Sequence, residues 1–561
     1  MSVSAVSHKP ATNPAGSRTR RRTTSLAILL PTFLLTALPL AAQEGQPLGL
    51  GLTWIQDPTT TMTIDWHVGD PSELPGLDYR VADGLAWSAV SPDESFPFPF
   101  TDRHIHRVEL TGLEPGTRYE FRFADGGEVY AFETFPADIV RTPLRLAIGG
   151  DIRHTGDQMT KTGRVAAQYN PHAFVFGGDL AYANGDPRRV DRWIEWFEIT
   201  RDEFRAPDGR IIPLIVGIGN HEVWYDRRLG DDDPALLAEW GLQDGDAPFF
   251  NTLFPQPSGK TYRVLDVGDY LSLVILDTDH VEPVAGEQTE WLARVLAERT
   301  HIPHVIPIYH VPAYPSVRAF DGGTNIRVRQ LWSPLFEEYR IPLAFEHHDH
   351  IYKRTVPIRE GQEHPNGVVY LGDGSWGVSP REIGRSHAEP AWYLKRAAEV
   401  RHAQILTLHG PMKHVLMVDE DNRIIDEFPR VMLDFAGGPV ARAEPARVIL
   451  GEMPEPEPAP VFISVAPQIL TSYVGQFEAV VDGAPVLLEV IQMVDGSLGL
   501  NVPILGAEGL PLRAETETLF HVEELGARLQ FEAVSSGPAQ FMEVHYAGDQ
   551  ATAVRVESDG R

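Results

Sequence analysis

The chain has 561 residues, no cysteine, and 78 acidic against 48 basic side chains, which gives a formal net charge of −30. The absence of cysteine excludes disulfides, thiolate zinc sites, iron–sulfur clusters and cysteine nucleophiles. The acidic balance argues against a nucleic-acid backbone as the main partner, because like charges repel. The length exceeds that of one ordinary domain, so we expect two or three folded domains.

Residues 1–42 have the pattern of a secretory signal peptide. Four arginines at positions 18–22 precede an apolar run from Leu26 to Ala42, and no acidic residue occurs before Glu44. A positive segment, an apolar core and a small-residue end are typical of such signals. We therefore expect cleavage near Ala42 and a secreted or periplasmic protein without a membrane segment. An uncleaved N-terminal anchor is the alternative.

Residues 48–140 alternate in the manner of β-strands. In one expected strand, every second side chain is apolar: Met62, Ile64, Trp66 and Val68. Such a period of two places these side chains on one face of a strand. A turn at Pro115-Gly116 is followed by Tyr119, at the place of a tyrosine corner in a β-sandwich. The segment resembles a fibronectin type III domain, and we expect it to be structural.

Residues 143–430 alternate short apolar runs with helical patterns. The runs expected to be strands are Leu144–Ile148, Ala173–Phe176, Ile211–Ile218, Leu271–Leu276, Val305–Ile308 and Leu343–Phe345. Between them, an apolar stripe over Trp291–Leu296 predicts one helix, and Asp191 is expected to cap another. Alternating strands and helices predict an α/β layered core.

The remaining chain divides into a linker and a third domain. Residues 436–460 are rich in proline and glutamate, which stiffen a chain without allowing a helix, so we expect a linker. Residues 461–561 alternate again, with turns expected at Asp482-Gly483 and Asp495-Gly496. Through the segment 473–478, they resemble the small β-barrel domain that follows some bacterial hydrolases. A small all-β domain is expected.

Potential metal ligands directly follow five of the expected strands. In chain order these residues are Asp151, then Asp179 with Tyr182, then Asn220-His221-Glu222, then His310, then His348 and His350. Each alone has an ordinary structural explanation, such as a turn, a helix cap or a hydrogen-bonded histidine. Five in succession indicate one site, because the carboxyl ends of strands in an α/β sheet are where sites assemble.

The ligand types restrict the metal. Oxygen and nitrogen donors without sulfur suit iron, zinc, manganese or magnesium. Seven ligands are too many for one tetrahedral ion but fit two ions that share a carboxylate, an arrangement suited to phosphoryl displacement.

These five blocks resemble those of the calcineurin-like metallophosphoesterases. The tyrosine three residues after Asp179 is the mark of the purple acid phosphatases, and residues 348–357 and Gly372-Asp-Gly374 are similar to that subfamily's later blocks. The resemblance covers about residues 48–430. It implies a four-layer α/β sandwich, with the ligands on loops at one edge, preceded by the fibronectin-like domain.

The resemblance also implies a role for each candidate ligand. The first ion, Fe(III), would be held by Asp151, Asp179, Tyr182 and His350. The second ion, which is iron, zinc or manganese, would share Asp179 and be completed by Asn220, His310 and His348. A metal-bound hydroxide would then attack phosphorus.

His221 corresponds to the family histidine that contacts the phosphate or protonates the leaving oxygen, and Glu222 would orient it. The chain also departs from the family pattern. Arg153 stands in the first block, where it could bind a phosphate oxygen or form a surface salt bridge. His347 replaces the usual glycine. Ala319 and Phe320 stand where plant enzymes have a histidine pair, and Arg318 is the candidate substitute in substrate binding.

The leading hypothesis is an exported binuclear-metal phosphomonoesterase of the acid phosphatase type, acting on a small phosphorylated substrate. A phosphodiesterase or nucleotidase on the same metal core is the alternative. A non-catalytic surface-binding or carbohydrate-binding protein is a third hypothesis, which seven intact ligands disfavour. A homodimer is left open.

Overall fold

The structure is a computed structural model. It describes residues 46–123, 127–153, 156–225, 240–383, 391–429, 449–450, 462–481, 484–493, 496–503, 507–522, 527–534, 537–546 and 549–556. The expected signal peptide and all but two residues of the expected linker lie outside these ranges. No helix within them combines the length and apolar character that a bilayer-spanning segment needs.

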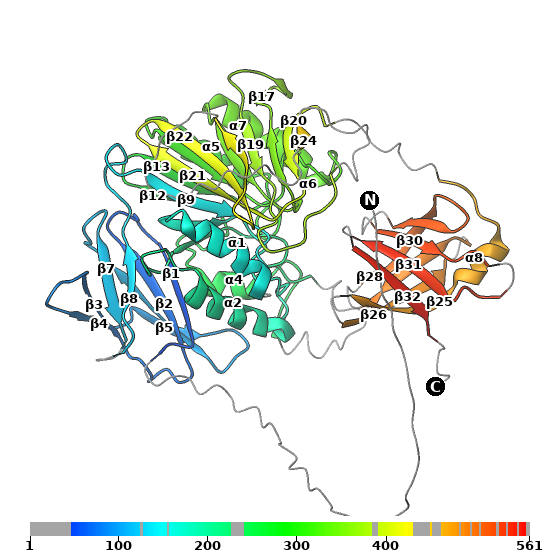
Figure 1. Cartoon of the computed structure of the whole chain (residues 1–561), viewed down its shortest axis with the longest axis horizontal. Helices are drawn as coiled ribbons and strands as arrows, with labels where there is room; N and C mark the ends of the chain where they lie inside the picture. Colours follow the sequence, from blue (N-terminus) through cyan, green and yellow to red (C-terminus); the bar gives the residue numbers. More distant parts are fainter. Residues whose placement is uncertain are drawn as a thin grey trace, which may run out of the picture. The chain divides into compact units, whose positions relative to one another are not determined.

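The N-terminal domain is a sandwich of two antiparallel sheets, drawn in blue in Figure 1. One sheet has the order β1-β2-β6-β5: Gly49–Thr53, Met62–Val68, His104–Leu110 and Glu94–Pro97. The other has the order β4-β3-β7-β8: Ser88–Val90, Leu77–Val81, Arg118–Arg122 and Tyr130–Glu133. The Tyr119 hydroxyl accepts the backbone N–H of Glu114 at 2.9 Å, so the predicted tyrosine corner is confirmed.

Strand β2 is buried along its whole length. Ile64 and Trp66 join the core between the two sheets, as their alternation predicts. The opposite face packs on the next domain, where the ring of His67 lies 4.6 Å from that of Phe197 in helix α2 (Val190–Glu203). On that same face, Arg107 donates to Asp65 at 2.6 Å and to the carbonyl of Leu253 at 3.4 Å. This face of the first domain therefore packs directly against the second domain.

The second domain contains two large mixed sheets. The six-stranded sheet has the order β11-β10-β9-β21-β22-β23: Leu214–Val216, Ala173–Phe176, Leu144–Gly149, His402–His409, Met412–Asp419 and Ile424–Phe428. The eight-stranded sheet has the order β12-β13-β14-β15-β19-β16-β20-β24: Arg263–Val267, Leu271–Ile275, His304–Ile308, Leu343–Glu346, Val369–Gly372, Tyr352–Thr355, Leu394–Ala398 and Ile449–Leu450. The described pair 449–450 thus forms an edge strand within the expected linker. A short hairpin pairs β17 (Ile358–Arg359) with β18 (Gln362–Glu363).

The two sheets pack face to face, with helices on both outer faces. One cluster of buried side chains, including Leu146, Ile148, Leu273 and Phe345, lies between the sheets. Helices α1, α2 and α4 cover the six-stranded sheet: Gly156–Gln168, Val190–Glu203 and Pro248–Leu253. Helices α5, α6 and α7 cover the eight-stranded sheet: Glu287–Glu298, Gly323–Leu331 and Ser333–Glu338. The predicted four-layer sandwich is confirmed.

Two local predictions in this domain are wrong. The run Ile211–Ile218 forms a strand only over Leu214–Val216, because Pro213 has no N–H to pair and the residues before it bond to other segments. Asp191 lies inside the first turn of α2 instead of capping it. Asp186 caps the preceding 3₁₀ turn, Pro187–Arg189, by accepting the N–H of Arg188 at 2.9 Å.

The C-terminal domain is a closed barrel of eight antiparallel strands, drawn in orange to red in Figure 1. Its strands β25–β32 are Gly475–Val481, Ala484–Gln492, Leu498–Val502, Ala507–Ala514, Leu519–Val522, Ala527–Phe531, Phe541–Tyr546 and Asp549–Arg555. Helix α8 (Pro467–Tyr473) precedes them, and Tyr473 stacks on Phe531 with ring centroids 4.3 Å apart. The predicted small all-β domain is confirmed; turn residues 482, 483 and 495 lie outside the described residues.

Candidate metal centre

All seven predicted metal ligands lie on loops at the carboxyl ends of parallel strands. Strands β9, β10 and β11 run parallel in one sheet, and β14 and β15 run parallel in the other. Because the two sheets face each other, the loops that follow these five strands meet at one edge of the sandwich.

The backbone of these loops is unusual. Five of the seven residues have a positive φ: Asp151 (57°), Asp179 (55°), Tyr182 (56°), His348 (80°) and His350 (60°). Such a conformation is uncommon outside glycine and clusters at functional sites, where the surrounding fold holds it in place. Gly374 leaves room for one of them, because a Cβ there would lie 2.0 Å from Oδ2 of Asp151. The fold thus imposes this loop geometry.

One candidate metal group contains Asp151, Asp179 and His350, whose ligand atoms all lie within 4.8 Å of one another. Nε2 of His350 is 2.9 Å from Oδ1 of Asp151. The Tyr182 hydroxyl lies 3.3 Å from the same carboxylate oxygen and 3.4 Å from Nε2 of His350. These four residues are the set expected for the first ion.

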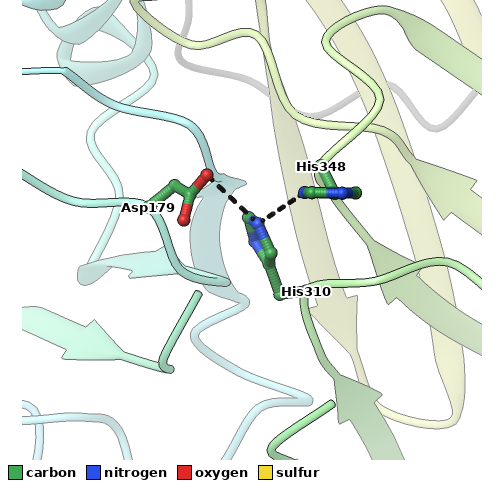
Figure 2. Close-up of side chains that lie close together, drawn as sticks. All are labelled: Asp179, His310 and His348. Carbon is green, nitrogen blue, oxygen red and sulfur yellow. Dashed lines mark hydrogen bonds and ion pairs between the residues drawn. The ribbon is translucent and has the colours of Figure 1, made fainter. Parts of the chain in front are cut away.

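A second group contains Asp179, His310 and His348, drawn in Figure 2. Nε2 of His310 is 3.2 Å from Oδ2 of Asp179 and 3.1 Å from Nδ1 of His348. Oδ1 of Asn220 lies 3.3 Å from the same Nε2 atom. These residues are the set expected for the second ion, and Asp179 belongs to both groups.

The donor set fits metal cations. Asp151 and Asp179 expose 0% and 1% of their surfaces, and their ligand atoms lie within 4.8 Å of each other. Two buried carboxylates this close repel unless cations lie beside them. Burial would lower the pKa of His310, but the charges of Asp179, Asp151 and Glu222 outweigh it and raise that pKa to about 9. The same negative field that attracts a proton to His310 would attract a metal ion.

Neighbouring groups fix the orientation of the ligands. The carbonyl of Gly177 accepts Nδ1–H of His310 at 3.0 Å, which leaves Nε2 directed at Asp179. Asp349, between the two histidine ligands, accepts the backbone N–H groups of Ser316 and Val317 at 2.6 and 2.7 Å. Such partners hold ligands in the orientation that metal binding requires.

His347 has a structural position. It is fully buried, and its ring packs directly against two glycines. A Cβ added at Gly150 would lie 2.7 Å from the ring, and a Cβ added at Gly177 would lie 1.9 Å from it. Neither ring nitrogen has a hydrogen-bond partner among the described residues, and burial lowers the pKa of this histidine to about 3. His347 is therefore a neutral ring packed beneath the ligand loops, and it does not line an exposed pocket.

His221 lies beside both groups, but the hydrogen bonds of Glu222, its expected orienting partner, are to backbone and not to its ring. Its Nδ1 makes a short hydrogen bond to Oδ1 of Asn184, its ring stacks on Tyr182, and its Nε2 lies 3.9 Å from Oδ2 of Asp179. Glu222 instead accepts the backbone N–H groups of Gly219, Asp179 and Leu180, each at 2.8 Å. Glu222 therefore joins two ligand loops, and Asn184 makes a side-chain hydrogen bond to the imidazole.

The two predicted substrate-binding arginines occupy different positions. Arg318 lies with Nε 3.4 Å from Oδ1 of Asp349, and its side chain is 41% exposed. Arg153 is half-buried with φ 66°. Burial lowers the pKa of Arg192, and the positive charges of Arg189 and Arg153 lower it further, so Arg153 lies near Arg192. Arg192 in turn donates to the carbonyl of Tyr182 at 2.6 Å. Both arginines therefore lie near residues of the candidate centre.

Three residues at this edge were not predicted. Asn184 lies two residues after Tyr182 in the left-handed region (φ 62°), and the turn-forming pair Asn184-Gly185 is the sequence signal that could have identified it. His280 follows β13 and lies with its ring centroid 5.5 Å from that of His310. Arg381 follows β19 and donates to the carbonyl of His348 at 3.0 Å. The last two come from strand ends that had been assigned no ligand.

Comparison with known proteins agrees with this geometry. Residues 47–134 match the purple acid phosphatase N-terminal domain, and residues 144–352 match the calcineurin-like phosphoesterase family. Purple acid phosphatase 18 of Arabidopsis thaliana is 24% identical over 352 residues, covering 61% of this chain and 75% of the plant protein. Acid phosphatase type 7 of Mus musculus is 26% identical over 424 residues, covering 68% of this chain and 90% of the mouse protein.

A solved structure supports the fold. The purple acid phosphatase from yellow lupin (Lupinus luteus) seeds aligns with a TM-score of 0.53 at 19% identity, covering 68% of this chain and 73% of the lupin chain. The two family matches occur in succession and together cover more than half of the chain. The chain thus carries a calcineurin-like phosphoesterase domain, a domain of phosphoric ester hydrolases, directly after an N-terminal domain of the purple acid phosphatase type.

Proposed function

We propose that the protein is a binuclear-metal phosphomonoesterase of the acid phosphatase type. The observation that carries this proposal is the shared position of Asp179, which belongs to both candidate metal groups. A shared carboxylate between two oxygen–nitrogen ligand sets is the arrangement that two-metal hydrolysis of phosphate esters requires.

Each ion has an assigned set of residues in this proposal. Asp151, Asp179, Tyr182 and His350 would hold Fe(III), since a phenolate is a hard anionic ligand. Asp179, Asn220, His310 and His348 would hold iron, zinc or manganese. Two such cations, when bound, would polarise a phosphoryl oxygen and lower the pKa of water.

His221 is the proposed proton donor to the leaving oxygen. Because Oδ1 of Asn184 accepts Nδ1–H, the other ring nitrogen, Nε2, is the one near Asp179, and it has a proton to donate when the imidazole is doubly protonated. The stack on Tyr182, with centroids 4.0 Å apart, limits rotation of the imidazole. A held imidazole beside the metal ligands suits general acid catalysis. Arg153 and Arg318 are the proposed partners of the phosphate oxygens.

The substrate class and location are part of the same proposal. The names of the plant and mouse relatives, acid phosphatases, support a small phosphate monoester as substrate. The arginine-led apolar pattern of residues 1–42 supports export.

A paired assay tests the function. The full chain, loaded with iron and zinc or with manganese, should hydrolyse p-nitrophenyl phosphate faster than bis(p-nitrophenyl) phosphate. Asp179→Asn should abolish hydrolysis, whereas the exposed Asp102→Asn removes the same charge and should not change it. A faster rate on the diester would replace the proposal with a phosphodiesterase. No cleavage of either ester would contradict the proposal.

A further inference from the structure

The loop of residues 311–318 connects the candidate ligand His310 to Arg318, a proposed partner of the phosphate oxygens. Within this range the backbone forms neither a helix nor a strand. Its path therefore depends on hydrogen bonds to side chains of other segments, because buried backbone groups need partners. The side chain that binds the end of the loop is Asp349, which stands between two candidate histidine ligands in the sequence.

Asp349 contacts both the backbone and the side chain of Arg318. Its Oδ2 accepts the backbone N–H groups of Ser316, Val317 and Arg318 at 2.6, 2.7 and 3.2 Å. Its other oxygen, Oδ1, lies 3.4 Å from Nε of Arg318. The carboxylate is fully buried, whereas the arginine side chain is 41% exposed. One buried carboxylate thus restricts where an exposed guanidinium can lie.

A cluster of buried charges holds the earlier part of the same loop. Nζ of Lys353 lies 2.6 Å from Oε2 of Glu346 and 3.3 Å from Oδ2 of Asp373, and all three side chains are fully buried. Glu346 accepts the backbone N–H of Ala313 at 2.7 Å, and Asp373 accepts the hydroxyl of Ser316. The loop is therefore attached to β15, β16 and the end of β19 before it reaches Arg318.

We propose that Asp349 is a positioning residue that holds Arg318 toward the phosphoryl group of the substrate. This inference rests on the proposed function, in which Arg318 binds phosphate oxygens. The contact with Asp349 is at Nε, and a guanidinium presents further N–H groups at its two Nη atoms, in a fork that matches phosphate oxygens. Asp349 acts through Arg318, without touching the substrate.

Asp349→Asn changes one of these contacts selectively. The amide oxygen can still accept the three loop N–H groups, but the NH₂ group then faces Nε of Arg318, donor against donor. Titration calorimetry of inorganic phosphate into the metal-loaded full chain measures the result without hydrolysis. Asp349→Asn and Arg318→Gln should each weaken phosphate binding about tenfold, the effect of one charge-assisted contact. The double variant should bind no more weakly than Arg318→Gln alone.

Further measurements separate positioning from a general structural effect. Metal content and the visible absorption of the iron-loaded protein should be the same in Asp349→Asn as in the wild type. In steady-state kinetics, Asp349→Asn should raise KM with little change in kcat. Arg318→Lys changes an exposed side chain, keeps the charge and removes the fork, so it should weaken phosphate binding nearly as much as Arg318→Gln. The exposed Arg294→Gln in α5 should leave binding unchanged.

Several results would overturn the inference. These are a wild-type protein that binds no phosphate, a single variant at Asp349 or Arg318 that binds it as tightly as the wild type, and losses that add fully in the double variant. Loss of metal from Asp349→Asn would also overturn it, since Asp349 would then act on the ligands.

The outcomes also separate this inference from the proposed function. A protein in which the two losses do not add, but which hydrolyses no ester, would contradict the function alone. A protein that hydrolyses monoesters and shows fully additive losses would contradict the inference alone.

Discussion

The phenol ring of Tyr182 stacks on the imidazole of His221, with ring centroids 4.0 Å apart and planes inclined by 27°. One residue is a proposed metal ligand and the other is the proposed proton donor, so this contact joins the two functions of the site. The same imidazole bonds to Asn184, and the same phenol oxygen lies near Asp151 and His350. A substitution of Tyr182 should therefore show in the visible absorption of the iron-loaded protein, and a substitution of His221 should show in kcat.

Replacing Tyr182 by phenylalanine should remove the metal contact and keep the stack. Iron-loaded protein should be coloured by charge transfer from phenolate to Fe(III), and Tyr182→Phe should abolish the visible absorption band. Visible spectroscopy on protein of matched iron content checks this. An unchanged band would remove Tyr182 from the ligand set.

Asn184 and His221 should act as one unit. His221→Ala should lower kcat by about 10²–10⁴-fold, the usual contribution of a general acid. Asn184→Ala should lower kcat less, because it frees the imidazole to rotate and to change tautomer. Adding Asn184→Ala to His221→Ala should cost little more, since the orienting role needs the imidazole. Fully additive losses in steady-state kinetics would show that the two residues act separately.

Glu222 should stabilise the loops instead of taking part in proton transfer. Glu222→Gln replaces one of two accepting oxygens by a donor that faces backbone N–H groups. The free energy of unfolding should fall by about 1–3 kcal/mol, the usual cost of buried groups left without partners. Urea unfolding measures this loss, and the exposed Glu298→Gln is its control. If stability is unchanged while the pH dependence of kcat shifts, Glu222 acts in proton transfer.

His67 should make the protein sensitive to acid. It is 1% exposed between Phe98 and Phe197, with no hydrogen-bond partner for either nitrogen among the described residues. Burial, with the charges of Arg103 and Arg201, lowers its pKa from 6.5 to about 3. Between those values only the unfolded state takes up the proton, so stability falls as pH decreases from 6.5 toward 3.

The size of this effect follows from the pKa difference. At pH 5, this one histidine should cost about 2 kcal/mol relative to neutral pH. His67→Leu should remove that cost and narrow the difference between urea midpoints at pH 7.5 and pH 5. The exposed His301→Leu should not narrow it. Equal narrowing by both variants would show that His67 is not responsible.

Much of the fold and the site was predictable because residues of metal-ligand type directly follow apolar strand patterns in the sequence. Strand β10 has the predicted bounds, and Asp151, Asp179 and His310 follow buried strands whose ends meet at one edge. The period-two pattern also predicted the terminal β domains. These features depend on local spacing, which a sequence shows directly.

What was not predictable depends on contacts between loops. Glu222 stands next to His221 in the sequence, but its carboxylate turns to the backbone of Gly219, Asp179 and Leu180. Arg381 follows its strand by nine residues, and only the folded loop brings it to His348. Neither position has a local pattern, because a loop's path is set by the backbone partners it meets.

The central claim is that Asp179 joins two metal ions in one chain, and the metal content of the purified protein tests it most directly. Elemental analysis of the full chain should find two ions per chain, at least one of them iron, and Asp179→Asn should lose metal while Asp102→Asn keeps both. A wild-type protein that binds no metal, or that Asp179→Asn leaves fully loaded, would contradict the account.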